Sequence, residues 1–508
     1  MWQSPLYRLR IRQNNPFINI IPEPLRIDPK GFFFGDLVGY IEPEWLGIKV
    51  FVWDIMFSNI RHAKNCLLDG ERIKGEDMNS YDVIVVGGGM MGTACAYYLT
   101  REGLKTALVE RGDIASGTVS HTDGNIGYSE KQPGVDMLQG YHSLQLYMEM
   151  EKEFDYDFEF ERDGKGDPSG YIIACVTDFE MEEAKKRAKE MQDLNLEAYA
   201  VGPKEFQELE PLVSKDLAGA LWMPKESSVC PFRVAFGYVY ESQKTGLLDV
   251  YYRTEVKDVL QDPVTKAVQG IVTDKGETLR APKVVNAAGC WAPFIGAMVG
   301  LDIPIEPRYG QLMVTEKTGK ITQHRGFIEY GYILAKYLKN DTYDRQVSPL
   351  VEAYNVCFNI TTAHTGNTQI GGCRLFRGYS IKSEYQIMTA IAERAIRFFP
   401  MLKNVNCIRS FGGLRPFCLD HLPIVSDVEE VPGFYICSGH EGSGIALGPV
   451  AGKLISEYAT GQELYFPEAR ELAWSRFTPE KIAAYRKAEQ ENTRELEEKE
   501  KQFEHKRY

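Results

Sequence analysis

The sequence predicts an α/β fold in which a parallel-sheet domain is interleaved with a second domain built on a mixed or antiparallel sheet. Three observations predict it. The apolar, β-branched run Val83–Val86 is typical of a buried parallel strand. The run Lys283–Gly289, far along the chain, indicates another strand of the same sheet and ends at small residues. Between Ile303 and Gly372 the sequence alternates and is rich in Tyr, Thr and Ile, which favours a mixed or antiparallel sheet.

The first strand opens a βαβ unit. Gly87, Gly89 and Gly92 follow it in the GxGxxG spacing, and a second strand, Thr106–Val109, ends at Glu110. In such units the first glycine permits a tight turn, the second lets the backbone approach a pyrophosphate, and the third lets the helix pack closely on the strand. The acid accepts hydrogen bonds from a ribose diol. The pattern therefore predicts a dinucleotide site and leaves FAD and NAD open.

The other elements are predicted from periodicity and breaker residues. Helices are expected at Val135–Glu153, Phe179–Leu194, Lys204–Glu210, Pro231–Gly246, Glu384–Phe399 and Ile445–Tyr458. Strands are expected at Tyr171–Val176, Leu248–Arg253, Thr254–Gln261, Ala267–Thr273 and Thr278–Leu279. The tail from Pro479 is dense in Glu, Lys and Arg, so we expect a solvated helix or a frayed terminus rather than a partner-binding helix.

The first 77 residues are unusual, because a dinucleotide domain normally begins close to its first strand. Lys74–Asp77 can be encoded by a purine-rich stretch that resembles a bacterial ribosome-binding site. We therefore hypothesise that Met78 is the true start and that residues 1–77 are an extended gene model. The alternative is a genuine extension, since Phe32–Trp53 is rich in aromatic residues that can pack on a surface.

Composition narrows the class of protein. The chain of 508 residues is 44% hydrophobic and 25% charged, and its net charge of −13 argues against a nucleic-acid partner. Its ten cysteines form no CxxC and no metal-ligand spacing, which predicts no metal and favours a reducing, cytoplasmic location. The most apolar long stretch, Trp45–Ile60, carries Lys49 and Asp54, so no membrane span is predicted.

Five blocks of this sequence resemble the D-amino-acid oxidase group of FAD-dependent oxidoreductases. The blocks are Val85–Gly92 with Glu110 and Arg111, Ser116–Thr118, Asn286–Ala292, Gly413–Pro416 with Asp420–Ile424, and Gly439–Pro449. Within the group the chain looks most like glycine oxidase, the β subunit of sarcosine oxidase, opine oxidase, D-hydroxyproline dehydrogenase and hydrogen cyanide synthase subunits. The likeness spans roughly Ser80 to Gly461. It favours FAD over NAD, because NAD-using flavoprotein reductases of the disulfide type need a second GxGxxG, which this chain lacks.

The resemblance implies a glutathione-reductase-type FAD-binding domain at 78–160, 228–300 and 410–462. A substrate domain is then expected at 161–227 and 301–409, and a charged tail at 463–508. The FAD contacts it implies are Gly87, Gly88, Gly89, Met90, Met91, Gly92, Glu110, Arg111, Ser116, Gly117, Thr118, Asn125, Ile126, Val256, Ala288, Gly289, Trp291, Gly413, Gly442, Ser443, Gly444 and Ile445. Covalent attachment is known among relatives, but the spacing of Cys418 to Asp420 does not match that pattern, so we expect non-covalent FAD.

The family's chemistry suggests roles for a few side chains. Arg415, in the Gly-Leu-Arg-Pro motif, is expected to clamp a substrate carboxylate, although a structural ion pair is the alternative. His440 is predicted to tune the flavin, although a lone histidine is more often structural. Tyr309 and Tyr332 are weaker candidates for the substrate pocket. Arg308 receives no role, because relatives often place arginine one position later.

Two further features concern the flavin. The helix that begins after Gly442–Gly444 is expected to direct its N–H groups at negative charge on the reduced flavin. The loop 119–127 departs from the family, because His121-Thr122-Asp123 stands where relatives often carry a small or basic run.

The resemblance implies an enzyme that oxidises the C–N bond of a small amine or amino acid of the glycine, sarcosine, D-amino-acid or opine kind. A hydride passes to flavin N5, and the resulting imine hydrolyses. Electrons then go to O2 or to a partner subunit, in a homo-oligomer or a hetero-oligomer. The alternatives are an electron-relay subunit and a 2-hydroxy-acid or glycerol-phosphate dehydrogenase, which needs a catalytic histidine.

Overall fold

The computed structural model describes residues 80–324, 326–337, 343 and 345–507, together with the short pieces 7–8 and 23–24. The chain divides into two units, Met1–Glu76 and Asp77–Tyr508. In the first unit, strands β1 (Tyr7–Arg8) and β2 (Glu23–Pro24) pair antiparallel. The hypothesis about residues 1–77 otherwise concerns residues outside the described part of the chain and stays untested.

A six-stranded sheet forms the first layer of the second unit, in the order β10-β4-β3-β14-β22-β21. The strands are β3 (Val83–Val86), β4 (Thr106–Val109), β10 (Leu248–Tyr251), β14 (Val284–Asn286), β21 (Ile424–Asp427) and β22 (Phe434–Ser438). All neighbours are parallel except the pair β21 and β22. The predicted parallel sheet is therefore confirmed, and β14 joins β3 despite its distance along the chain.

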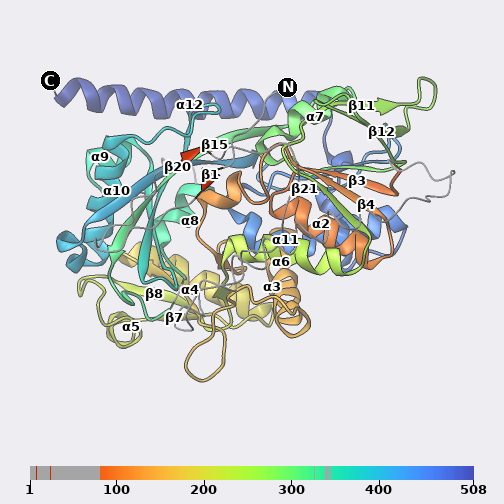
Figure 1. Ribbon diagram of the computed structural model, residues 1–508. Helices are drawn as coiled ribbons and strands as arrows, with labels where there is room; N and C mark the ends of the chain where they lie inside the picture. The colour runs from red at the N-terminus through yellow and green to blue at the C-terminus, as the bar shows by residue number, and fades with distance from the viewer. Residues whose placement is uncertain are drawn as a thin grey trace. The chain divides into compact units, whose positions relative to one another are not determined.

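Helices cover this sheet because their small and apolar residues face its buried side chains. They include α2 (Met90–Arg101), α3 (Val135–Glu153), α6 (Pro231–Lys244) and α11 (Gly444–Thr460). Helix α2 packs on β3 and β4, and α11 packs on β21 and β22, while α6 packs on α2 and α3 packs on α11 (Figure 1). The closest approach is between α11 and α2, where a Cβ added at Gly452 would meet the Ala94 backbone carbon at 2.7 Å. Val83 and Val85 beneath α2 are completely buried.

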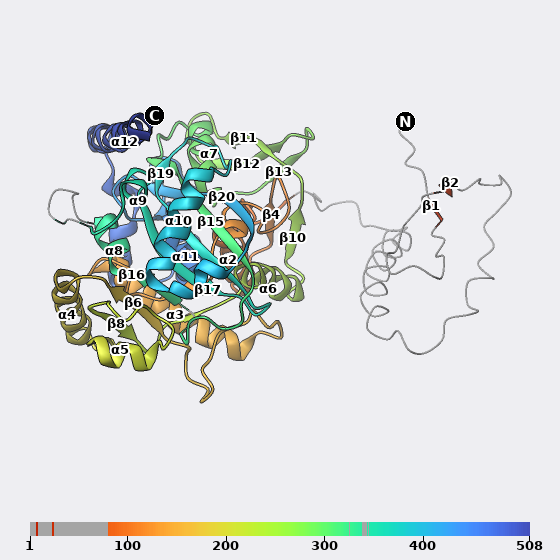
Figure 2. The same cartoon turned by 90° about the vertical axis from the view of Figure 1, so that its left-hand side faces the viewer.

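A second, larger sheet has the order β19-β15-β18-β17-β16-β6-β8-β7, with β20 also paired to β15. Its strands are β6 (Tyr171–Cys175), β7 (Tyr199–Val201), β8 (Gly219–Met223), β15 (Ile305–Lys317), β16 (Gly326–Glu329), β17 (Val356–Thr362), β18 (Asn367–Cys373), β19 (Leu375–Phe376) and β20 (Cys407–Cys418). The pair β16 and β6 is parallel and the other pairs are antiparallel, so the predicted mixed sheet is confirmed. The helices α4 (Asp178–Asp193) and α5 (Pro203–Leu209) lie beside β8 (Figure 2).

The remaining elements connect these layers. They are β5 (Asn125–Ile126), β9 (Ser227–Ser228), the antiparallel sheet β11 (Val256–Gln261), β12 (Val268–Thr273) and β13 (Thr278–Arg280), and the helices α7 (Ala292–Met298), α8 (Tyr330–Tyr337), α9 (Pro349–Ala353) and α10 (Tyr385–Phe398). Of these elements β11, β12, β13 and α10 were predicted individually, and their predicted and observed ends differ by two residues or fewer, as helix and strand ends commonly do.

Strand β20 lies in a different sheet from the one its predicted domain implies. Residues 410–462 were assigned to the cofactor domain, but β20 pairs with β15 from Ile305↔Cys418 to Thr315↔Cys407. The return to the six-stranded sheet begins at β21 instead. Residues 77–508 form one compact unit, so the division into two domains stays a prediction.

The charged tail forms one long helix, α12 (Pro479–Arg507), which runs along the edge of the second unit past α7 and α9 (Figure 1). It is anchored at both ends: Arg486 Nη1 lies 2.7 Å from Asp302 Oδ2, and Lys499 Nζ lies 3.1 Å from Glu352 Oε1. The helical alternative for the tail is therefore confirmed. No helix in the described part of the chain is both long and apolar enough to pass through a bilayer.

A buried carboxylate, Glu329, ties the second sheet to α10 and to the loop before α9. It accepts hydrogen bonds from Arg394 Nε at 3.0 Å and from Arg345 Nη2 at 3.1 Å. Burial alone raises the pKa of this carboxyl, but the two guanidinium charges and the Phe358 N–H outweigh it and hold the pKa below its ordinary value. The charged form is therefore the stable one in the folded protein.

We expect Glu329→Gln to lower the free energy of unfolding by about 3 kcal/mol, because two buried cations lose their counter-charge. A depressed pKa adds stability that is complete above the pKa of an unfolded glutamate and lost as pH falls through the folded pKa. The variant should therefore differ most from the wild type near neutral pH, in denaturant titrations at several pH values. The control Glu352→Gln removes an exposed partner and is expected to change stability by about 0.5 kcal/mol or less.

Candidate cofactor and active site

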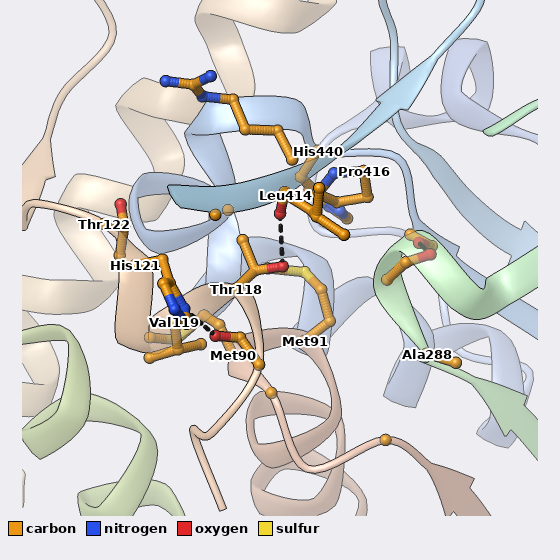
Figure 3. Close-up of a pocket in the computed structure, with 18 of the residues that line it drawn as sticks. Met90, Met91, Thr118, Val119, His121, Thr122, Ala288, Leu414, Pro416 and His440 are labelled. Atoms are coloured by element: carbon orange, nitrogen blue, oxygen red, sulfur yellow. Dashed lines mark hydrogen bonds between the residues drawn. The ribbon is translucent and has the colours of Figure 1, made fainter. Parts of the chain in front are cut away.

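A cavity of about 1120 Å³ lies where the two sheets face each other. Its lining comes from the carboxyl ends of β3, β4 and β14, the N-termini of α2 and α11, and strands β15, β17 and β20 of the second sheet. Ligands of open parallel sheets bind at this carboxyl edge. Figure 3 shows part of the lining, with Met90 and Met91 of α2 opposite Leu414 and Pro416 of β20.

The glycine turn after β3 has the geometry that its spacing predicted. Gly87 has φ +111°, which favours glycine, and a Cβ there would lie 2.6 Å from the Ala287 carbonyl oxygen. A Cβ at Gly92 would lie 1.7 Å from the Gly87 carbonyl oxygen, so only glycine allows α2 to approach β3. A Cβ at Gly89, the N-cap of α2, would meet nothing within 4 Å. The backbone is thus open to a ligand at Gly89, beside the unpaired N–H groups of the first helical turn.

The acid after β4 organises the loop that follows it. Glu110 Oε2 accepts a hydrogen bond from Gly88 N and Oε1 accepts one from Gly112 N, both at 2.6 Å. The Arg111 guanidinium lies 3.9 Å from the ring centroid of Trp291, which follows β14. Thr118 donates a hydrogen bond of 2.8 Å to the Leu414 carbonyl and so ties this loop to β20 (Figure 3).

The cavity brings together most of the residues singled out by sequence. They are Gly87, Gly89, Met90, Met91, Glu110, Arg111, Ser116, Gly117, Thr118, Asn125, Val256, Ala288, Gly289, Trp291, Gly413, Gly442, Ser443, Gly444, Ile445, Tyr332, Arg415 and His440. Three others stand behind the lining: Gly88 bonds Glu110, Gly92 packs against Gly87, and Ile126 is 1% exposed.

Tyr309 is a wrong prediction. Its side chain is 0% exposed and its hydroxyl lies 2.8 Å from Gln311 Oε1, on the side of β15 away from the cavity. The next residue, Gly310, lines the cavity instead, because successive residues of a strand face opposite sides of the sheet. Arg308, which received no role, is a buried partner of Glu441, with Nη1 3.2 Å from Oε1.

Arg415 reaches from β20 across β15 into the cavity. Its Nη1 donates a hydrogen bond of 2.9 Å to the Cys373 carbonyl at the end of β18. The guanidinium fits there because a Cβ at Gly310 would lie only 2.2 Å from Nη1. A Cβ at Gly442 would lie 3.3 Å from Arg415 Nε, so the arginine also meets the start of α11. No carboxylate partner is recorded for Arg415 within the described ranges, so the structure gives no support to the alternative of a structural ion pair.

His440 lies in the wall just before α11. It is 3% exposed, and neither ring nitrogen has a hydrogen-bond partner within the described residues. Burial, together with the positive charge of Lys131, lowers its pKa to about 3, so the ring is neutral near pH 7. Buried polar atoms are normally paired with protein, ordered water or a ligand, so the His440 ring is available to a ligand of the cavity.

The polar residues of the lining that sequence reasoning missed include Lys131, Asp123, Glu130 and Asn359. Lys131 is 2% exposed and donates a hydrogen bond of 2.8 Å to Ser443 Oγ, at the start of α11. Asp123 Oδ2 accepts one of 2.8 Å from Asn359 Nδ2, and Glu130 Oε1 accepts one of 2.7 Å from the Tyr171 hydroxyl. The only signal for this group was the unusual loop 119–127. No set of three or more potential metal ligands is clustered in the part of the chain that the structure describes.

The turn, the helix N-termini and the acid define a dinucleotide-binding oxidoreductase fold. The family model described as "DAO: FAD dependent oxidoreductase" matches residues 82–458, and the chain belongs to this family of FAD-dependent oxidoreductases.

Two curated relatives match this chain over most of their own length. Hydrogen cyanide synthase subunit HcnC of Pseudomonas aeruginosa is 27% identical over 80% of this chain and 98% of that protein. Glycine oxidase of Geobacillus kaustophilus is 26% identical over 76% of this chain and 94% of that protein. The crystal structure of glycine oxidase from Geobacillus kaustophilus has the same fold, with a TM-score of 0.67 and 22% identity over 79% of this chain and 100% of that chain. The predicted family, fold and cofactor are confirmed.

The residues present fit FAD. The open backbone at Gly89 and the N-terminus of α2 suit a pyrophosphate, and Glu110 suits a ribose. Cys418 is unsuited to a covalent link: it is 1% exposed, does not line the cavity, and burial raises its thiol pKa well above the ordinary value.

We therefore expect acid denaturation to release all of the flavin into the supernatant, measured by its absorbance after precipitation of the protein. Cys418→Ser should retain the wild-type flavin content, because the thiol is buried and does not line the cavity. Flavin that stays with the precipitated wild type and is lost from this variant would contradict the expectation.

Proposed function

We propose that this protein oxidises the C–N bond of a small amino acid or amine whose carboxylate is held by Arg415. The observation that carries the proposal is the position of that guanidinium, which lines the same cavity as the N-termini of α2 and α11. A planar guanidinium matches a carboxylate with two parallel hydrogen bonds. The sheet behind it provides glycines at 310 and 372, so the guanidinium takes this position without steric conflict.

FAD, when bound, supplies an acceptor for the hydride that leaves the carbon next to nitrogen. The chain's own groups prepare the site. The N–H groups at the N-terminus of α11 would stabilise negative charge on the reduced cofactor. Lys131 places a positive charge beside this N-terminus through its hydrogen bond to Ser443. Tyr332 closes the pocket beside Arg415, and its hydroxyl lies 3.7 Å from the Cβ position of Gly442. The imine product then hydrolyses, which releases the amine nitrogen.

A second function is favoured by His440. A 2-hydroxy-acid dehydrogenase needs a neutral histidine to take the hydroxyl proton, and both ring nitrogens of His440, in the cavity wall, lack a partner among the described residues. The lowered pKa of His440 keeps the ring neutral but also makes it a weak base, so this second function ranks below the first. A partner subunit is also part of the proposal for either chemistry, because one relative is by name a subunit of hydrogen cyanide synthase.

The test is anaerobic stopped-flow bleaching of the flavin absorbance. The panel contains glycine, sarcosine, D-amino acids, proline derivatives, opines and 2-hydroxy acids. Bleaching by amines supports the proposal, whereas bleaching by hydroxy acids alone supports the second function. Admission of O2 afterwards separates an oxidase from a dehydrogenase that passes electrons to a partner. A flavin-loaded protein that no amine bleaches would contradict the proposal.

A further inference from the structure

The part of the cavity lining that comes from the second sheet, called the floor below, has positive charge at one end and negative charge at the other. Its positive end is Arg415, whose guanidinium covers Gly310 of β15 and Gly372 of β18. The neighbouring strands are β17 and then β16 and β6, in that order. Neighbouring strands lie about 4.8 Å apart, so β17 stands one spacing and β6 stands three spacings, about 14 Å, from β18.

Negative charge gathers on these farther strands. Asn359 of β17 holds the Asp123 carboxylate by a hydrogen bond of 2.8 Å, and Tyr171 of β6 holds the Glu130 carboxylate by one of 2.7 Å. Both carboxylates line the cavity that Arg415 lines. A ligand whose carboxylate binds Arg415 at one end of this floor therefore directs the rest of its structure toward the carboxylates of Asp123 and Glu130 at the other end.

Buried polar atoms without partners show that the cavity is built for a polar ligand. The Asn359 Oδ1 atom is buried and makes no hydrogen bond to any described residue. His440 is 3% exposed, and both of its ring nitrogens are likewise buried without a hydrogen bond to any described residue. Leaving such atoms unpaired costs about 1–3 kcal/mol each, so a ligand that supplies donors stabilises the site.

The environment of Asp123 favours a cation beside it. Burial, followed by the repulsion from Glu130, raises the pKa of Asp123 to about 6, although Asn359 and Arg415 act in the opposite direction. The Glu130 carboxylate of the same cavity thus opposes the ionisation of Asp123. A positive group placed between them relieves both the repulsion and the loss of hydration.

We propose that the substrate carries a second, cationic group, a protonated amine or a guanidinium, which binds between Asp123 and Glu130 while its carboxylate binds Arg415. This inference rests on the proposed function. The amine that is oxidised must lose its proton before the hydride leaves, so it is not the group that the two carboxylates hold as a cation. Lysine and arginine carry such a cation at the end of a long side chain, so they are suitable probes of this inference.

The first experiment compares matched ligands on the flavin-loaded protein without O2. Perturbation of the flavin absorbance gives the dissociation constant for both enantiomers of lysine against norleucine and of arginine against citrulline. These pairs differ in charge at nearly constant length. At least one cationic ligand should bind about tenfold more tightly than its neutral partner, equivalent to about 1.4 kcal/mol. Equal or tighter binding of the neutral partner in both pairs would overturn the inference.

Variants identify the groups responsible. Asp123→Asn and Glu130→Gln should each weaken binding of the preferred cation about tenfold and change binding of its neutral partner by less than about twofold. Asp163→Asn removes an exposed carboxylate outside the cavity and should leave the preference unchanged. Unaltered flavin content in each variant shows that the site is intact. A preference that survives both cavity substitutions would contradict the assignment of these carboxylates.

The two proposals fail in different ways. Bleaching by neutral amino acids, with no preference for a cation in binding, would uphold the proposed function and overturn this inference. Tight, charge-dependent binding with no bleaching by any amine would overturn the proposed function and uphold the recognition of a cationic ligand.

Discussion

Gly89→Ala is expected to give a folded protein that has lost most of its affinity for FAD. The new methyl group meets no atom within 4 Å, so the chain accommodates it. As the N-cap of α2, alanine costs about 1 kcal/mol or less. The methyl group occupies the space through which a pyrophosphate approaches the backbone. We expect the dissociation constant of FAD to rise about a hundredfold, equivalent to about 2.7 kcal/mol.

The measurement is a fluorescence titration of flavin-free protein with FAD, alongside the thermal denaturation midpoint. Two controls separate cofactor loss from misfolding. Gly92→Ala should fail to fold, because its Cβ would lie 1.7 Å from a backbone oxygen. Gly164→Ala, where a Cβ also meets nothing within 4 Å but outside the cavity, should bind FAD as the wild type does. Wild-type FAD affinity in Gly89→Ala would place the cofactor elsewhere.

Arg415→Lys is expected to lower kcat/KM about a hundredfold while leaving the flavin bound. An ammonium is a point charge with no fixed fork, so it replaces at most one of the two parallel hydrogen bonds to a carboxylate. One charge-assisted hydrogen bond contributes about 1.5–3 kcal/mol, which matches a loss of this size. Lysine has no guanidinium group, so the space over Gly310 that the Arg415 guanidinium occupies is left unfilled.

Steady-state kinetics with the preferred substrate measures this effect, and the flavin spectrum reports the state of the cofactor. Arg409→Lys is a matched control, because Arg409 is exposed on the same strand and lies outside the cavity. It should leave KM unchanged. An unchanged KM in Arg415→Lys would remove this residue from substrate recognition and would return it to a structural role.

Elements with strong local signals were predicted closely from the sequence. The helix expected at Val135–Glu153 has these bounds in the structure, and the strand expected at Val83–Val86 does as well. Both follow from interactions within a few residues, namely an apolar run or a helical repeat with a glycine before it. The turn at Gly87 and the packing at Gly92 were likewise predictable, because backbone sterics alone require glycine there.

Features that depend on non-local pairing were not predictable in the same way. Strand β20 carries a motif of the cofactor family, yet its partner is β15, and nothing within residues 407–418 encodes that partner. Tyr309 was assigned to the pocket because of its residue type. A shift of one residue along a strand exchanges its two faces, so the choice between Tyr309 and Gly310 needed the register.

The polar lining of the cavity was the least predictable part of the site. Lys131 and Glu130 belong to a connection without regular periodicity, and loops place side chains by their tertiary contacts. Two buried groups fix this connection: Glu226 Oε1 accepts a hydrogen bond of 2.7 Å from Ser129 N, and Arg187 Nε donates one of 2.8 Å to the Ser129 carbonyl. Glu226 and Arg187 are distant in sequence, so the direction of Lys131 follows only from the assembled fold.

Because β22 lies beside β14 in the first sheet but comes late in the chain, the first sheet cannot be completed until most of the protein has been synthesised. Strands β3 and β4 leave the ribosome early, but β22 and α11, which finish the sheet and the cavity, come after the whole second sheet. Synthesis from Val109 to Phe434 takes roughly half a minute at about 5–20 residues per second. From the synthesis of β14 until that of β22, the edge of β14 that later pairs with β22 has no partner. An unpaired apolar strand edge can pair with other chains. A chain released before residue 434 is therefore prone to aggregate, and the FAD cavity is complete only after α11 has been made.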